Sequence, residues 1–234
     1  MLNYEIDPAR LKPHVPAGTE LDFWSGRTFV SVVGFYFQNI RVRGIPVPFH
    51  RHFEEVNLRF YVRRKTADGW RRGAVFIKEL VPRRAIAWTA RTFYNEPYLA
   101  LPMSHRIEKI PGRPEEVKSA AYFWRFAGRE HSLKLTTRGG AQPLVENSEA
   151  EFITEHYWGY TSQCDGSTLE YQVEHLRWRI WEAQTTEFQC DLAGLYGEPF
   201  CRPLNPAPAS AFLAEGSAVK VHQGVRLKPQ ALLK

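Results

Sequence analysis

The residues from 53 to 63 show a clear alternation of apolar and polar side chains. Apolar residues occupy every second position and polar residues lie between them: Val56, Leu58, Phe60 and Val62, alternating with Glu55, Asn57, Arg59 and Tyr61. A period of two with β-branched and aromatic residues predicts a strand. A second apolar run, 73–82, follows a turn signal at Asp68-Gly69. Two strands joined by an Asp-Gly loop predict a hairpin.

The second run carries adjacent charges at Lys78 and Glu79. Neighbouring side chains of a strand point to opposite faces, so these two residues cannot share one. At least one of them therefore points into a core or a lined cavity, where a buried charge needs a partner.

The rest of the chain predicts further strands and a few short helices. Asp7 before Pro8 predicts a helix start, and apolar spacing predicts a helix within 82–94. Residues 28–37 predict a buried strand, and residues 109–117 a polar loop. Hairpins are expected over 120–126 with 131–137, and over 151–161 with 168–175. This pattern predicts a mainly β fold with a mostly antiparallel sheet, and leaves barrel and sandwich as alternatives.

Composition limits the class of protein. The 234 residues are 44% apolar and 14% aromatic, enough for one large β domain or two small ones. No apolar stretch is long enough for a transmembrane helix, and the first residues lack a secretory signal pattern. Three cysteines without a Cys-x-x-Cys pair predict neither a disulfide framework nor a zinc site. We therefore expect a reduced, cytoplasmic protein.

The formal charge of +6 is partly local. Basic residues flank the turn of the central hairpin: Arg63, Arg64, Lys65, Arg71 and Arg72. This hairpin tip is either a solvated turn or a basic surface for nucleic acid or anionic lipid. We favour the solvated turn and expect no nucleic-acid or membrane partner.

The polar face of the first strand is the main candidate site. It is either a solvent-exposed edge or the lining of a polar cavity. In a cavity, Arg59 would bind a carboxylate through two hydrogen bonds, and Glu55 would act as an acid or base. If Glu79 shares that face, a Glu-Arg-Glu cluster results in which one carboxyl group has a strongly shifted pKa.

Two further patterns carry chemistry. Lys78 lies in apolar sequence, so it is either an exposed lysine or a desolvated Schiff-base nucleophile. His50, His52 and Glu54 have acceptable spacing for metal ligands on a strand, but no further cluster supports them. We expect no metal and no cofactor.

Several motifs resemble the DUF2071, or YqjF-like, family of bacterial proteins. They include 53–63, Glu79-Leu80-Val81-Pro82, Tyr94-Asn95-Glu96-Pro97-Tyr98 and Tyr157-Trp158-Gly159-Tyr160. The resemblance runs nearly end to end and implies one domain over 1–234. It places the chain in the acetoacetate decarboxylase-like superfamily, which implies a closed antiparallel β-barrel with a central cavity and short flanking helices. Members have about ten more residues before the motif at Asn3, so a first strand is expected to be missing here.

The same resemblance bears on catalysis. The decarboxylase uses a lysine pair, and that pair falls on Pro97 and Tyr98, neither of which forms a Schiff base. One family glutamate matches Glu55, another falls near Ser31, and the family arginine would precede Met1. Lysine-dependent decarboxylation is therefore not expected unless Lys78 has taken over.

Three hypotheses follow. The leading one is a protein that binds a small carboxylate or carbonyl ligand in its central cavity. Arg59 is the anchor in that hypothesis, the polar lining is Glu55, Asn57, Tyr61 and Glu79, and the rim is Tyr94, Asn95, Glu96 and Tyr98.

The second hypothesis is a decarboxylase-like lyase or a hydrolase acting on keto or enol acids, with Glu55 or Glu79 in acid–base chemistry and Lys78 as nucleophile. The third is a non-catalytic protein that binds a partner through the basic hairpin. Homo-oligomer formation is implied by the resemblance alone.

Overall fold

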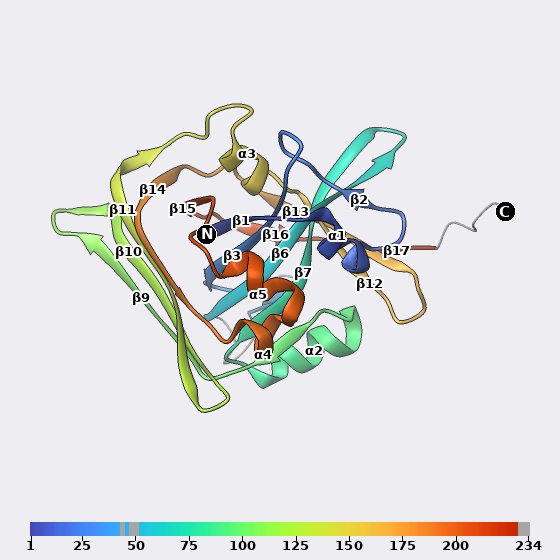
Figure 1. Ribbon diagram of the computed structural model, residues 1–234, viewed down its shortest axis with the longest axis horizontal. Helices are drawn as coiled ribbons and strands as arrows, with labels where there is room; N and C mark the ends of the chain where they lie inside the picture. The colour runs from blue at the N-terminus through green and yellow to red at the C-terminus, as the bar shows by residue number, and fades with distance from the viewer. Residues whose placement is uncertain (43–44, 47–51, 229–234) are drawn as a thin grey trace.

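The computed structural model describes the backbone of residues 1–42, 45–46 and 52–228, and the side chains of 41–51, 89–91, 93 and 94 lie outside the description. The strands are β1 (Leu2–Ile6), β2 (Glu20–Leu21), β3 (Thr28–Phe37), β4 (Arg41–Val42), β5 (Ile45–Pro46), β6 (Phe53–Thr66), β7 (Gly69–Val81), β8 (Tyr98–Ala100), β9 (Met103–Ile110), β10 (Arg113–Phe126), β11 (Arg129–Gln142), β12 (Trp158–Ser162), β13 (Thr168–His175), β14 (Ile180–Gln189), β15 (Ser210–Ala214), β16 (Val219–Val221) and β17 (Val225–Leu227). The helices are α1 (Pro8–Leu11), the 3₁₀ turn η1 (Lys12–His14), α2 (Arg84–Tyr94), α3 (Glu149–Thr154), α4 (Leu192–Tyr196) and α5 (Glu198–Leu204) (Figure 1).

Most strands belong to one large mixed sheet. Its order is β16-β13-β12-β7-β6-β3-β1-β15-β14-β11-β10-β9, with β2, β8 and β17 paired to its members. Only the pairings of β7 with β12 and of β7 with β8 are parallel among the described strands, as a mostly antiparallel sheet requires. The described pairings form an open path from β16 to β9, so the closed barrel implied by the resemblance stays a prediction.

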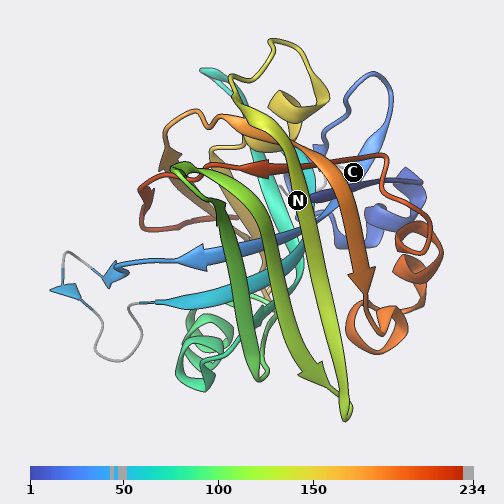
Figure 2. The ribbon, with the colours of Figure 1, turned by 90° about the vertical axis from the view of Figure 1, so that its left-hand side faces the viewer.

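The sheet bends so that its two halves face a common core. Figure 2 shows β9, β10, β11 and β14 running across the direction of β3 and β6 behind them. The apolar face of β6 is buried in this core, as its alternation predicted. Val56, Leu58 and Phe60 lie in one cluster with Trp124 of β10 and Leu133 of β11.

Local signals identified several elements correctly. The strand at 28–37 is β3, and α2 lies within the predicted helical segment. The Asp7 side chain accepts a hydrogen bond from the backbone N–H of Ala9 at 2.8 Å, which caps α1. No helix in the described part of the chain has the length and apolar character needed to cross a membrane.

Two predicted segments were wrong. The loop expected over 109–117 is the end of β9, a turn with Gly112 at φ 76°, and the start of β10. Both faces of these strands are largely solvent-exposed, so their polar sequence resembled a loop. Residues 149–154 form α3 rather than strand, because the Ser148 side chain accepts from the backbone N–H of Glu151 and starts a helix.

Candidate functional site

The polar face of β6 is buried against neighbouring strands. Asn57 pairs with Glu79 of β7, and Glu79 pairs with Tyr98 of β8. Paired residues on adjacent strands direct their side chains to the same face. Glu55 and Glu79 are each 3% exposed, and Asn57 is fully buried. The interpretation of this face as an exposed edge was therefore wrong.

Glu55 is held by two hydrogen bonds. Asn57 Nδ2 donates to its Oε1 at 2.8 Å, and the Tyr98 hydroxyl donates to its Oε2 at 3.1 Å. Burial is the largest influence on Glu55 and raises its pKa to about 7, although these hydrogen bonds and the charge of Arg59 act in the opposite direction. A carboxyl group with this pKa can both donate and accept a proton near neutral pH.

Two further carboxyl groups, those of Glu79 and Glu96, lie beside Glu55. Burial raises the pKa of both, and the charges of Glu96 and Glu55 raise that of Glu79 further. The interaction between the two groups raises the pKa of Glu79 and lowers that of Glu96, which favours a proton on Glu79. Within the described structure the Oε2 atoms of both residues are buried without a hydrogen-bond partner. A proton shared between them satisfies both oxygens.

Two residues that the sequence did not single out complete this cluster. The hydroxyls of Thr161 and Tyr171 donate to Glu96 Oε1 at 2.5 and 3.1 Å. Tyr171 pairs with Gly159 across β12 and β13, and a methyl group at Gly159 would overlap the Tyr171 ring. A glycine inside a predicted strand often marks such a close approach, so Gly159 was a usable signal.

The tyrosines of the cluster are proton donors. Burial, followed by the nearby carboxyl charges, raises the pKa of Tyr98 and Tyr171 well above their usual range. Their hydroxyl groups therefore stay protonated at any physiological pH and can hydrogen-bond to carboxylates.

Arg59 has no ion-pair partner among the described carboxylates. Its Nε donates to the Tyr61 hydroxyl and its Nη2 to the Ile153 carbonyl, each at a long 3.4 Å. The Tyr61 hydroxyl lies 2.6 Å from Ser31 Oγ, and Ser31 donates to Asn3 Oδ1 at 2.7 Å. Neutral oxygens thus orient the half-buried guanidinium group without neutralising it.

The remaining predicted residues are not all brought together. Lys78 pairs with Leu58 of the core face, so it points away from the face that carries Glu79. The Tyr94 side chain lies outside the described residues. Asn95 adopts a left-handed backbone conformation (φ 55°), and its Nδ2 donates to the Ser162 carbonyl at 2.7 Å.

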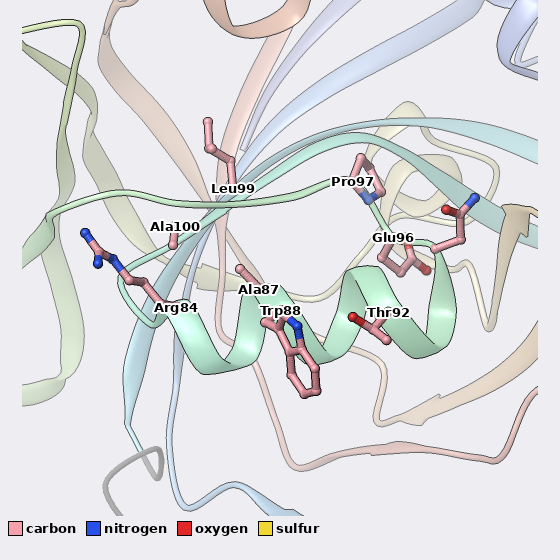
Figure 3. Close-up of a pocket in the computed structure, with 9 residues that line it drawn as sticks. Arg84, Ala87, Trp88, Thr92, Glu96, Pro97, Leu99 and Ala100 are labelled. Atoms are coloured by element: carbon pink, nitrogen blue, oxygen red, sulfur yellow. The ribbon is translucent and has the colours of Figure 1, made fainter.

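Two clefts lie on either side of the turn formed by Asn95, Glu96 and Pro97. The first measures about 840 Å³ and lies between α2 and β8 (Figure 3). Its other lining residues are Arg84, Ala87, Trp88, Thr92, Leu99 and Ala100. The second measures about 270 Å³ and is lined by residues 75–77 of β7 and 160–162 of β12. Both clefts reach Glu96, and neither is lined by Arg59 or Glu55.

His50 lies outside the described residues, so the metal-ligand spacing of His50, His52 and Glu54 stays untested. Among the described residues no group of three possible metal ligands is found. Glu54 Oε1 is hydrogen-bonded to His105 Nδ1 at 2.7 Å.

The arginines of the central hairpin are paired with carboxylates. Arg63 contacts Glu20 at 2.7 Å and Arg72 contacts Asp22 at 2.6 Å. Arg64 and Arg71 both contact the buried carboxylate of Glu170. These ion pairs compensate much of the local charge on which the hypothesis of a basic interface depended.

Comparison with known proteins identifies the family. The model of DUF2071, described as an uncharacterized conserved protein, matches residues 1–218. The chain belongs to this family. It is also 29% identical over 188 residues to the uncharacterized protein YqjF of Bacillus subtilis (strain 168), covering 78% of this chain and 72% of YqjF. The resemblance inferred from the motifs is thereby confirmed.

Solved structures show the same fold at low sequence identity. The acetoacetate decarboxylase of Legionella pneumophila superposes with a TM-score of 0.62 at 13% identity, over 97% of this chain and 83% of that one. An acetoacetate decarboxylase-like enzyme from Sphingomonas wittichii RW1 gives 0.62 at 16%, over 98% and 90%. The enduracididine biosynthesis enzyme MppR, complexed with pyruvate, gives 0.62 at 13%, over 97% and 87%. This DUF2071 protein therefore has an acetoacetate decarboxylase-like fold.

Proposed function

We propose that the protein binds a small carboxylate or carbonyl ligand beside the polar face of β6. Arg59 binds the carboxylate of the ligand, and Glu55 exchanges a proton with its carbonyl oxygen or an adjacent carbon. The observation that carries the proposal is a half-buried arginine without an acidic partner, on the same strand face as a buried carboxyl group whose pKa is about 7. An unpaired guanidinium group is well suited to bind a carboxylate. The proposal keeps the closed single-domain barrel and the cytoplasmic location expected from the sequence.

The structural relatives support this ligand class. MppR has been solved with pyruvate and with a condensation product of pyruvate and imidazole 4-carboxaldehyde. Pyruvate combines a carboxylate with a ketone, which are the two groups that Arg59 and Glu55 would recognise.

Acid–base catalysis on a keto or enol acid is the second candidate, favoured by the hydrogen-bonded pair of Glu55 and Tyr98. Such chemistry here does not use a Schiff base. The resemblance places the decarboxylase lysine pair at Pro97 and Tyr98, and Lys78 lies on the face of β7 opposite to Glu79.

A thermal-shift titration with pyruvate and acetoacetate tests the proposal. A ligand that binds only the folded state raises the melting temperature, and at 100 times its Kd it contributes about 2.7 kcal/mol. We expect a concentration-dependent rise for both acids and none for methyl pyruvate, which lacks the carboxylate. The rise should disappear in Arg59→Ala.

Arg63→Ala is the matched control, because Arg63 lies on the same strand but is paired with Glu20 at the surface. This variant should retain the full shift. The proposal is contradicted if Arg59→Ala keeps the shift in melting temperature, or if neither acid raises the melting temperature of the parent protein.

A further inference from the structure

Three carboxyl groups meet in the interior without a direct cationic partner among the described residues. Glu55 and Glu79 are each 3% exposed and Glu96 is 7% exposed. Three negative charges in a site of low dielectric constant repel one another strongly. The cluster must therefore hold protons at neutral pH.

The three carboxyl groups and the Tyr98 hydroxyl lie in a row. The Tyr98 hydroxyl donates to Glu55 at 3.1 Å, and Tyr98 pairs with Glu79 across β7 and β8. Glu79 in turn interacts with Glu96, and the Oε2 atom of each is buried without a hydrogen-bond partner. Glu96 is the member that lines both clefts beside Asn95 and Pro97. The row thus leads from Glu55 to the surface.

We propose that Glu96, Glu79 and Tyr98 form a proton relay between the clefts at Asn95 and Pro97 and the interior carboxyl group of Glu55. Its catalytic use rests on the proposed function, because Glu55 is the group that exchanges a proton with the ligand.

The transfer balances in protons and charge. The O–H bond of Glu79 breaks as its proton moves to the Tyr98 oxygen, and the original Tyr98 proton moves to ionised Glu55. Tyr98 ends unchanged, Glu55 is neutral and Glu79 is a carboxylate. Glu96 then takes a proton from a hydronium ion in the cleft, which leaves as water, and passes the proton to Glu79. One proton has moved from the cleft to Glu55.

The surroundings of Glu96 and Glu55 balance the protonated and the ionised forms of both carboxyl groups. Thr161 of β12 and Tyr171 of β13 donate to Glu96 Oε1 and favour its ionised form, so that it can accept a proton. From β6, Asn57 and the charge of Arg59 favour ionised Glu55. Burial opposes both effects. Glu96 and Glu55, at the two ends of the relay, can therefore each gain or lose a proton.

Infrared spectroscopy of the unliganded protein tests the resting state. We expect the carbonyl band of buried protonated carboxyl groups at pH 7, weakened in Glu79→Gln and unchanged in Glu182→Gln, which changes an exposed carboxylate of β14. If Glu79→Gln does not fold, Glu96→Gln replaces it. Removing the charge and acceptor of Glu96 should move the titration of the band to lower pH. Absence of the band from the parent protein overturns the proposal.

A rapid pH drop, followed by the infrared signal of Glu55, tests the transfer itself. Tyr98→Phe removes the bridging hydroxyl and should slow protonation of Glu55 on the order of 100-fold. Tyr4→Phe is the control, because Tyr4 is a buried tyrosine of β1 in the apolar core and lines neither cleft. An unchanged rate in Tyr98→Phe overturns the relay. Since no ligand is present, this outcome is independent of the thermal-shift result.

Discussion

Glu55 shows that the chemistry of one residue depends on what covers it. Its place in an alternating strand predicts that it shares a face with Asn57 and Arg59. Its pKa is decided by burial and by Glu96, which lies 41 positions further along the chain. The identity of the group was therefore predictable, but its protonation was not.

The pKa of Glu55 leads to a prediction for stability. Below pH 4.5 the carboxyl group is protonated in both the folded and unfolded states and contributes nothing. Between its ordinary value of 4.5 and about 7 the unfolded state ionises while the folded state keeps the proton, so the free energy of unfolding falls as pH rises. The difference corresponds to about 3 kcal/mol, which is constant above pH 7.

Glu55→Gln should remove the part of this fall that is due to Glu55 and leave the part due to Glu79 and Glu96, and denaturant titrations from pH 4 to 8 measure the change. Glu182→Gln, at an exposed position, should keep the slope of the parent protein. An equal slope in Glu55→Gln and the parent would show that Glu55 ionises normally in the folded state.

At the scale of elements, the hairpin of β12 and β13 completes the site. Its turn at Asp165-Gly166 was predictable from local sequence, whereas its contact with the 95–97 turn was not. Gly159 is the residue that permits this contact, because the Tyr171 ring lies across its missing side chain on the way to Glu96.

Gly159→Ala should therefore cost about 1–3 kcal/mol of stability through overpacking. In a Tyr171→Ala background the ring is gone and the same substitution should cost at least ~1 kcal/mol less. Denaturant unfolding of the two single variants and the double variant gives this coupling energy. Additive effects would mean that Gly159 is needed for some reason other than the Tyr171 ring.

At the scale of the whole molecule, the order of strands brings distant segments together. β1 lies between β3 and β15, so the first residues join two halves of the sheet. A single apolar cluster then spans both halves, including Leu58 of β6 and Leu133 of β11. This arrangement supports the expectation of one domain.

Leu58→Ala and Leu133→Ala test that expectation as a matched pair. Each truncation of a buried leucine should cost about 2–5 kcal/mol. In a single cooperative unit both variants shift the same transition, seen alike by circular dichroism and tryptophan fluorescence. Leu176→Ala, at an exposed leucine, should shift it little. Two transitions, each sensitive to only one variant, would indicate two domains.

The sequence by itself determined the elements that rest on local physics. Side-chain alternation defined the faces of β6, a side-chain cap started α1, and an Asp-Gly turn joined β6 to β7. The end of β9 and the start of β10 are exposed on both faces, lack that alternation and were mistaken for a loop. The family could also be recognised, because its motifs lie in contiguous segments.

Only the tertiary structure decided the site. Burial, protonation and ion pairing arise from contacts between residues far apart in sequence, such as Tyr171 with Glu96 and Arg64 with Glu170. For the same reason only the pairing of β7 with β6 showed that Glu79, and not Lys78, shares a face with Asn57. Local patterns specify which side chains share a face, and packing specifies what that face meets.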